Sequence, residues 1–345
     1  MYIKKILVFI LIIIGLGLAY LSYSIYQSVF DPNTAFETEE KEIFISKDDN
    51  MDSLIKQISS YLKDSESFVE VAQKKQYVPK AGHYIIKKDM NNNEIVNVLR
   101  SQNVPINITF NNAENIEDLS GKLASQFDAD SLAFLTILGE GLFLKNQEMT
   151  LQQSLSLYIP NTYEFYWDTS PKDVQKRLLT EYENYWNDNR EQKRKALNLS
   201  RLEVSVLASI VQKESVKIEE RATISGVYIN RLKRNMKLQA DPTVVYALKK
   251  KYNKPDTIIR RVLLKDLEID SPFNTYKNVG LPPAPLIMPD VSSLDAVLNY
   301  KKHNYFYFVA DTRNIGFHIF SKTLSEHNRN ARVYRQWVTK QNIYR

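Results

Sequence analysis

The stretch "LASIVQKES", from Leu207 to Ser215, decides how the C-terminal part of the chain is interpreted. Residues three, four and seven apart lie on one face of a helix. Glu214 stands seven positions after Leu207 and four after Ile210, so it shares their face. The pattern therefore predicts a helix that carries a carboxylate on its apolar stripe, where charged groups are normally avoided.

The residues before this stretch predict where the helix begins. Ser200-Arg201-Leu202-Glu203 has the spacing of a capping box, in which Ser200 is the N-cap and Glu203 reaches back to it. The capping box accounts for Glu203, so no catalytic role is needed to explain this carboxylate. The helix is expected to run from this box to about Ser215.

A carboxylate on the apolar stripe has a chemical use. Removing an ionised carboxylate from water raises its pKa, so the group can stay protonated near neutral pH and act as a general acid. The plainer alternative is that Glu214, in the last helical turn, simply reaches solvent. Two features favour the acid: the helix is apolar elsewhere, and Lys213 falls on a different face.

Composition limits the function classes. The 345 residues suffice for two or three domains, and 25% charged with 43% hydrophobic residues is typical of globular proteins. The net charge of +6 suits an anionic surface or polymer but is spread along the chain, unlike a nucleic-acid site. Cysteine is absent and the four histidines are far apart, so neither a metal nor another cofactor is expected.

The N-terminus predicts a membrane anchor. Lys4 and Lys5 precede an uncharged run over residues 6–26, and about 20 such residues span a bilayer as a helix. The positive-inside rule places residues 1–5 in the cytoplasm and the bulk of the chain outside the bacterial cytoplasmic membrane. A cleaved signal peptide is the alternative, but the run is long and ends in bulky residues. Residues 27–40 are interpreted as a polar linker.

Residues 41–108 predict a small α+β unit. "EIFISK" and "VPINITF" alternate like strands, and a further strand follows a turn at Gly82. "MDSLIKQISSYLK" and "NNNEIVNVLRS" have helical spacing, with Asn92 or Asn93 as the cap of the second. Two helices against short strands resemble a LysM-like fold.

The rest of the chain is divided into two regions. Residues 109–199 are expected to be mainly helical, with an aromatic segment at 158–171 that forms a packed loop or the wall of a cleft. Residues 200–345 mix helices and short strands. Here Asp241 is expected as an N-cap before Pro242, and Ser292 with Asp295 as a capping box. "YFYFVA" and "FHIFS" are expected to form a hairpin before a final helix.

Long segments of this C-terminal region resemble the MltG-type (YceG-like) endolytic murein transglycosylases. They are "LASIVQKES", "ERATISGVYINRLKRNMKLQADPTVVYAL", "SPFNTYKNVGLPPAPLIMP" and "YFYFVADTRNIGFHIFSKTLSEHN". The family pattern at the active helix is Glu-Lys-Glu with the second Glu catalytic; here the first position is Gln212 and the second is Glu214. Asn161 also stands where the family commonly has Asp.

The resemblance implies cleavage of the β-1,4 bond between N-acetylmuramic acid and N-acetylglucosamine within nascent peptidoglycan strands. Glu214 would protonate the glycosidic oxygen and then deprotonate the muramic 6-hydroxyl, which leaves a 1,6-anhydro end. A peptidoglycan synthase in the membrane is an expected partner. Candidate substrate-binding residues in or beside the matched segments are Gln239, Asn274, Thr275, Tyr276, Ser215 and Asp241, with turn formation as the alternative role of Asn274.

Two other functions stay open on sequence alone. A hydrolytic muramidase would need a second carboxylate, for which Asp241, Glu219 and Glu220 are the candidates. A membrane-tethered glycan-binding or scaffold protein would use the LysM-like unit and leave the C-terminal region inert. The products released from glycan strands distinguish the three: anhydro ends, reducing ends or none.

Overall fold

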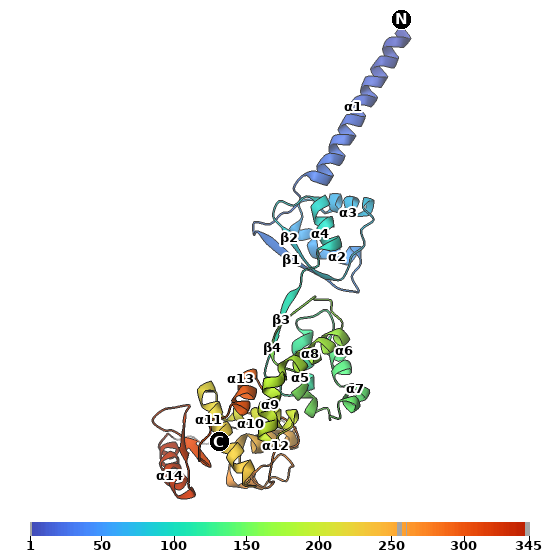
Figure 1. Cartoon of the computed structure of the whole chain (residues 1–345). Helices are drawn as coiled ribbons and strands as arrows, with labels where there is room; N and C mark the ends of the chain where they lie inside the picture. The colour runs from blue at the N-terminus through green and yellow to red at the C-terminus, as the bar shows by residue number, and fades with distance from the viewer. Residues whose placement is uncertain (1, 254–256, 260, 342–345) are drawn as a thin grey trace. The chain divides into compact units, whose positions relative to one another are not determined.

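The computed structural model of the protein describes residues 2–253, 257–259 and 261–341. The chain forms two compact units, a smaller one of residues 1–108, 126–129 and 163–170, and a larger one of 109–125, 130–162 and 171–345. Helices and strands are mixed, and the strands of the described residues pair in three two-stranded sheets (Figure 1). This mixed architecture with small sheets was predicted. The finer boundaries at 109 and 200 stay a prediction.

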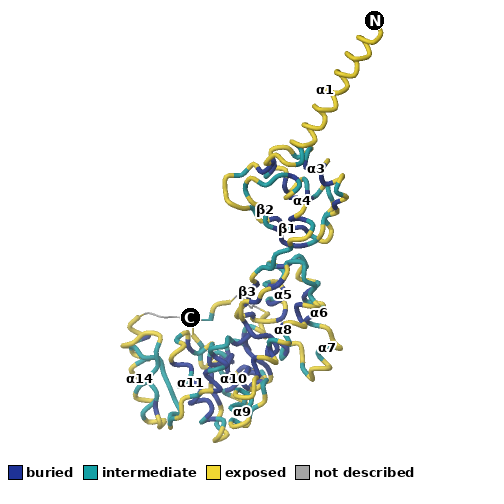
Figure 2. Tube along the Cα trace, turned by 45° about the horizontal axis from the view of Figure 1, so that its top comes forward, coloured by how far each residue is buried: buried dark blue, intermediate teal, exposed yellow. Residues whose placement is uncertain are grey.

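The first element is the apolar helix α1, Tyr2–Phe30. It contains the predicted run of residues 6–26 and is long and apolar enough to cross a membrane. Almost all of it is exposed within the protein, as its yellow trace in Figure 2 shows.

The smaller unit then alternates short strands with helices. Its elements are β1 (Glu40–Ile45), α2 (Met51–Ile58), the 3-10 turn Ser59–Tyr61, α3 (Ser65–Lys74), β2 (Gly82–Lys87) and α4 (Asn92–Ser101). β1 and β2 pair antiparallel, with Ile43 opposite Tyr84. The helix α3, capped by Asp64, was not expected, and the cap of α4 is Asn91 instead of Asn92 or Asn93. The likeness to a LysM fold stays a prediction.

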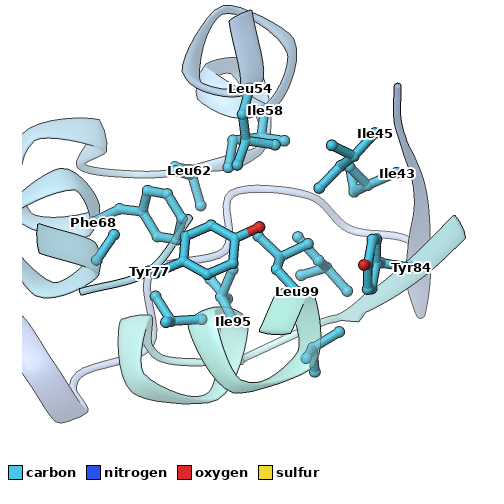
Figure 3. Close-up of a cluster of buried hydrophobic side chains, with 14 of the residues drawn as sticks. Ile43, Ile45, Leu54, Ile58, Leu62, Phe68, Tyr77, Tyr84, Ile95 and Leu99 are labelled. Atoms are coloured by element: carbon cyan, nitrogen blue, oxygen red, sulfur yellow. The ribbon is translucent and has the colours of Figure 1, made fainter. Parts of the chain in front are cut away.

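An apolar core joins the sheet and the helices of the smaller unit (Figure 3). Ile43 and Ile45 of β1 face Leu54 and Ile58 of α2, and all four side chains are fully buried. The alternation of β1 and the helical spacing of α2 produce these two apolar faces, as the sequence predicts.

Residues 27–40, predicted as a polar linker, pack in part on the smaller unit. Asn33 and Thr34 are buried against the smaller unit, and Val29 and Phe36 pack on its core. The Asn33 side chain donates to Asn92 Oδ1 at 2.7 Å and accepts from the Asp64 N–H at 2.8 Å. The end of α1 and this segment therefore belong to the folded smaller unit.

The larger unit begins with short helices. Its first elements are α5 (Ile116–Ala124), α6 (Ser131–Leu138), α7 (Gly141–Asn146), the 3-10 turn Gln153–Leu157, α8 (Pro171–Tyr185) and α9 (Asp188–Leu197). β3 (Ile106–Phe110) and β4 (Asn161–Phe165) pair with each other, and both strands pass from one unit to the other. The region was predicted as mainly helical, but the strand in the aromatic segment was not.

The C-terminal elements surround the helix predicted from "LASIVQKES". They are α10 (Arg201–Glu214), α11 (Ile218–Lys233), α12 (Asp241–Tyr252), the 3-10 turn Leu264–Glu268, α13 (Val291–Leu298), β5 (Tyr307–Ala310), β6 (His318–Ser321) and α14 (Leu324–Lys340). α10 packs against α11, α12 and α13 (Figure 1). β5 and β6 form the expected antiparallel hairpin.

Two predicted caps in this region are wrong. α12 begins at Asp241 with Ala240 at the N-cap, so Asp241 is not the capping residue. α13 is capped by Asp290, whose side chain accepts from the Ser293 N–H, and Ser292 lies inside the helix. In both cases the chain turns into the helix earlier than the capping pattern suggests, by one residue at α12 and by two at α13.

Candidate active site

The position of Glu214 follows from both ends of α10. The Ser200 and Glu203 capping box is formed as predicted, with the Glu203 N–H donating to Ser200 Oγ at 3.1 Å and the Ser200 N–H to Glu203 Oε2 at 2.7 Å. Leu207 and Ile210 are fully buried. The helix stops at Glu214, so the carboxylate lies at the end of an apolar stripe.

The carboxyl group of Glu214 meets a buried tyrosine. Tyr228 of α11 is 1% exposed, and its hydroxyl donates to Glu214 Oε1 at 2.5 Å. Burial raises the pKa of Glu214 to about 7, and the Tyr228 hydrogen bond opposes part of that rise because it favours the carboxylate. Nearby Asp241 raises this pKa further, and nearby Arg231 lowers it.

Glu214 lines a cavity of about 900 Å³ in the larger unit. The wall comes from the start of α5, the turn at 151–155, the end of α10, one face of α12, residues 259, 261 and 262, Leu286, and α14. Within it Glu214 has one oxygen held by Tyr228 and lies beside Asp241. The predicted aromatic segment 158–171 does not line this cavity, so it is not the cleft wall.

Asp241, expected as a helix cap, is the second carboxylate of the cavity. The Tyr276 hydroxyl donates to Asp241 Oδ1 at 2.5 Å. Solvent reaches Asp241 through the cavity, while the surrounding protein raises its pKa by desolvation, against the effect of the Tyr276 hydrogen bond. Since capping no longer accounts for it, Asp241 is available to act on a ligand.

The other predicted binding residues hold the walls in place. Asn274 is fully buried and donates to the Leu267 and Ile269 carbonyls, both at 2.8 Å. Thr275 is 1% exposed; its hydroxyl accepts from the Ala240 N–H, and its carbonyl accepts from the Gln239 N–H. Their place behind the wall gives no support to direct substrate binding by Asn274 or Thr275.

Gln239 and Ser215 occupy turns. Gln239 is exposed with a left-handed backbone, φ 48°, a conformation uncommon outside glycine and often found at functional sites. Ser215 is 3% exposed, and its hydroxyl accepts from the Lys217 N–H at 3.0 Å. Ser215 therefore ends α10 and turns the chain. Of the predicted binding set, Asp241 lines the cavity and Tyr276 bonds to it, whereas the other four are not among the described lining residues.

Sequence reasoning missed the residues that hold the acid. Tyr228 and Arg231 lie one turn apart on α11, and Arg231 donates to the Phe306 carbonyl at 2.6 Å and to the Leu238 carbonyl at 2.7 Å. This ties the start of the hairpin to the segment before α12. The one available signal was helical spacing, because both residues share the buried face of α11.

The structure also accounts for the Gln at position 212. Its amide donates to Asn112 Oδ1 at 2.7 Å, and its carbonyl oxygen accepts from the Asp290 N–H at 2.7 Å. A glutamine can donate and accept at once, whereas an ionised glutamate only accepts. Gln212 thus joins α10 to the start of α13, and Glu214 is the titratable group of the pair. Among the described residues, no three His, Asp or Glu side chains gather closely enough to hold a metal ion.

The chain is similar to curated proteins of two bacteria. A protein of Bacillus subtilis named endolytic murein transglycosylase is 39% identical over 195 residues, 56% of this chain and 50% of that protein. A protein of Streptococcus pneumoniae with the same name is 28% identical over 285 residues, which cover 73% of this chain and 50% of that protein. The chain thus spans about half the length of these curated relatives.

A solved structure agrees with these matches. A crystal structure of a YceG-like protein from Listeria monocytogenes superposes with a TM-score of 0.56 at 25% identity, over 85% of this chain and 99% of that one. The family model described as YceG-like matches residues 43–333, which include Glu214 and most of the residues that line the cavity. This chain belongs to the YceG-like family.

Proposed function

We propose that this protein is an endolytic peptidoglycan lytic transglycosylase. It would cleave the β-1,4 bond from N-acetylmuramic acid to N-acetylglucosamine within nascent strands and leave 1,6-anhydro ends. The names of the relatives support the substrate and the reaction class. The observation that carries the proposal is the enclosed carboxyl of Glu214, whose pKa of about 7 suits a group that both gives and takes a proton near neutral pH.

In the proposed mechanism Glu214 acts twice. Its protonated oxygen donates to the glycosidic oxygen as the bond to the muramic C1 breaks, and the sugar passes through an oxocarbenium-like state. The new carboxylate then accepts the proton of the muramic 6-hydroxyl, whose oxygen closes on C1. Tyr228 holds one carboxylate oxygen throughout, so the hydrogen bond at 2.5 Å fixes the direction of the other.

A hydrolytic muramidase is the second candidate, and the cavity gives it a specific basis. Hydrolysis needs a second carboxylate to activate water or to trap the sugar. Asp241 lines the cavity with Glu214 and is not used as a helix cap. Glu220, another candidate for the second carboxylate, is bound to the β5–β6 hairpin, because it accepts a hydrogen bond from the His318 N–H at 2.9 Å.

Product analysis separates these functions. Purified protein is incubated with isolated glycan strands, and the new ends are identified by mass spectrometry. Anhydro ends with no reducing muramic ends support the proposal. Reducing ends that disappear in Asp241→Asn would assign hydrolysis instead, and intact strands would leave a binding or scaffold role.

We also propose that α1 anchors the protein in the bacterial cytoplasmic membrane, with the N-terminus in the cytoplasm. Lys4 and Lys5 before the helix support this orientation. Because residues 33–36 pack on the smaller unit, that unit would lie at the membrane surface, near newly made strands and a peptidoglycan synthase. Cutting there would end strand elongation.

The anchor is tested by truncation. A chain that starts at residue 27 keeps Val29, Asn33 and Phe36, which belong to the smaller unit, and loses the membrane span. We expect it to cleave isolated strands but to fail to replace the full chain in cells, because tethering raises the effective concentration at the membrane. Full replacement by the exported truncated chain at native level would contradict the anchoring proposal.

A further inference from the structure

One face of α12 forms a wall of the cavity. Asp241, Val245 and Lys249 follow one another at four-residue intervals and all line it, as do Tyr246 and Lys250 beside them. At 1.5 Å per residue, Lys249 lies about 12 Å from Asp241 along the helix. The cavity therefore has an acidic end, where Glu214 and Asp241 lie, and a second end marked by lysines.

The lysine end is built from fixed polar groups. Lys250 Nζ donates to Gln152 Oε1 at 3.0 Å, and the Gln152 amide donates to the Tyr246 hydroxyl. The same ammonium lies 5.4 Å from the centre of the Phe273 ring. An ammonium has three donors, so one bond to Gln152 holds Lys250 at the wall and leaves donors for a ligand.

Further cations face the same cavity. Arg335 of α14 lines it together with Lys249 and Lys250, and Arg261 lines it too. Lys213 also lines the cavity, but at the acidic end, where it pairs with Glu114 at 3.6 Å. Apart from Glu214, Asp241 and the Lys213–Glu114 pair, the charged residues described in the lining are four cations (Lys249, Lys250, Arg261 and Arg335) and one carboxylate (Glu117). A neutral glycan alone would not require this excess of cations.

Helix electrostatics explains only part of this arrangement. Lysines are favourable in the last turn of a helix, and α12 has three there, Lys249, Lys250 and Lys251. The helix dipole favours a lysine on any face of the last turn equally, so it does not explain why lysines face the cavity. Two of the three line the cavity, whereas Lys251 lies 5.9 Å from the Tyr252 ring and is not among the described lining residues.

We propose that Lys249 and Lys250 form an anion subsite for the carboxylates of the substituents that the muramic sugars carry. This inference rests on the proposed function and extends it to how the strand is recognised. Every second sugar of the strand bears a lactyl group, which ends in a carboxylate or continues into a peptide with carboxylates. The span of about 12 Å from the acidic end is comparable to one disaccharide repeat, so the lysines would meet the next substituted sugar.

The test measures binding without cleavage. In the Glu214→Gln protein, affinity is measured for three strands: one with peptides, one stripped to free lactyl carboxylates, and a stripped one whose carboxylates are converted to neutral methyl amides. Lys249→Gln with Lys250→Gln is expected to weaken binding of an anionic strand roughly two- to thirtyfold and to reduce its salt dependence. Lys251→Gln is the matched control, since it removes the same charge from the same turn but not from the cavity.

The outcomes separate the two proposals. A loss confined to strands with peptides assigns the peptide carboxylates, and a loss that persists on the stripped strand assigns the lactyl carboxylate. An equal loss in Lys251→Gln, an equal loss on the neutral strand, or no loss would overturn the subsite while strand binding itself remains. If the Glu214→Gln protein binds none of the strands and the wild-type protein cuts none, the proposed function fails with it.

Discussion

Two regions of this molecule bury polar side chains, and they do so in opposite ways. In the smaller unit, Asn92 Nδ2 donates to the Ser28 carbonyl at 2.8 Å and to Ser67 Oγ at 3.0 Å, while its oxygen accepts from Asn33. In the larger unit, Glu214 is held by the single hydroxyl of Tyr228. The first group is neutral and bonded on both sides, and the second is titratable and faces a cavity.

The difference shows what each burial achieves. A buried amide whose donors and acceptor are all satisfied fixes one arrangement of the chain, here the end of α1 on the smaller unit. A half-buried carboxyl that faces a cavity and has an incomplete set of partners holds its proton more tightly and can lose it to a ligand. Stability is expected to depend on the first region, and activity on the second.

The largest expected effect is on activity. Glu214→Gln keeps the shape of the side chain and removes the titrating proton, so cleavage of isolated strands should fall about 10²- to 10⁴-fold or more. Strand cleavage is measured by the release of new ends. A near wild-type rate in the purified variant would show that Glu214 is not the acid.

The same substitution should not destabilise the protein. The pKa of Glu214 is raised from its ordinary value of 4.5 to about 7, so the folded state binds this proton more tightly than the unfolded chain. Its contribution to the free energy of unfolding is full below pH 4.5 and is lost as the pH rises through about 7. Urea unfolding at several pH values should show this component in the wild-type protein and not in Glu214→Gln.

The reverse behaviour is expected at Asn92. Asn92→Ala leaves the buried Asn33 amide short of a partner and should lower the stability of the smaller unit by about 1–3 kcal/mol. Hydrogen exchange of the β1 and β2 amides measures this. Asn97→Ala, an exposed change in the same helix, should stay within about 0.5 kcal/mol, and the activity of folded Asn92→Ala should be unchanged. If the β1 and β2 amides were equally protected from exchange in Asn92→Ala and Asn97→Ala, the Asn92 network would not stabilise the smaller unit.

The smallest effect is a shift of the pH profile. The Tyr228 hydrogen bond lowers the pKa of Glu214 by favouring the carboxylate, so Tyr228→Phe should raise that pKa. Net hydrogen-bond strengths correspond to about one pH unit or less. The alkaline limb of kcat/KM, where the acid loses its proton, should move up by that amount. A shift to lower pH would mean that Tyr228 does not stabilise the carboxylate.

Local patterns predicted much of the fold. Periodicity placed α10 and ended it beside Ser215, and the capping box at Ser200 formed as expected. Caps failed where several capping residues stand close together, as at Asn91 and at Asp290, because each can accept from the first free N–H groups. Which of them does so depends on where the packed chain turns.

The sequence by itself determined that Glu214 lies on an apolar stripe, because helical spacing is a property of neighbours along the chain. Only the tertiary structure decided what the carboxyl meets there. Tyr228 arrives from the next helix, Asp241 is drawn to Tyr276 instead of capping α12, and Asn33 is captured by the smaller unit. Each of these depends on residues distant in sequence, whose approach is set by how the apolar faces pack and not by any local pattern.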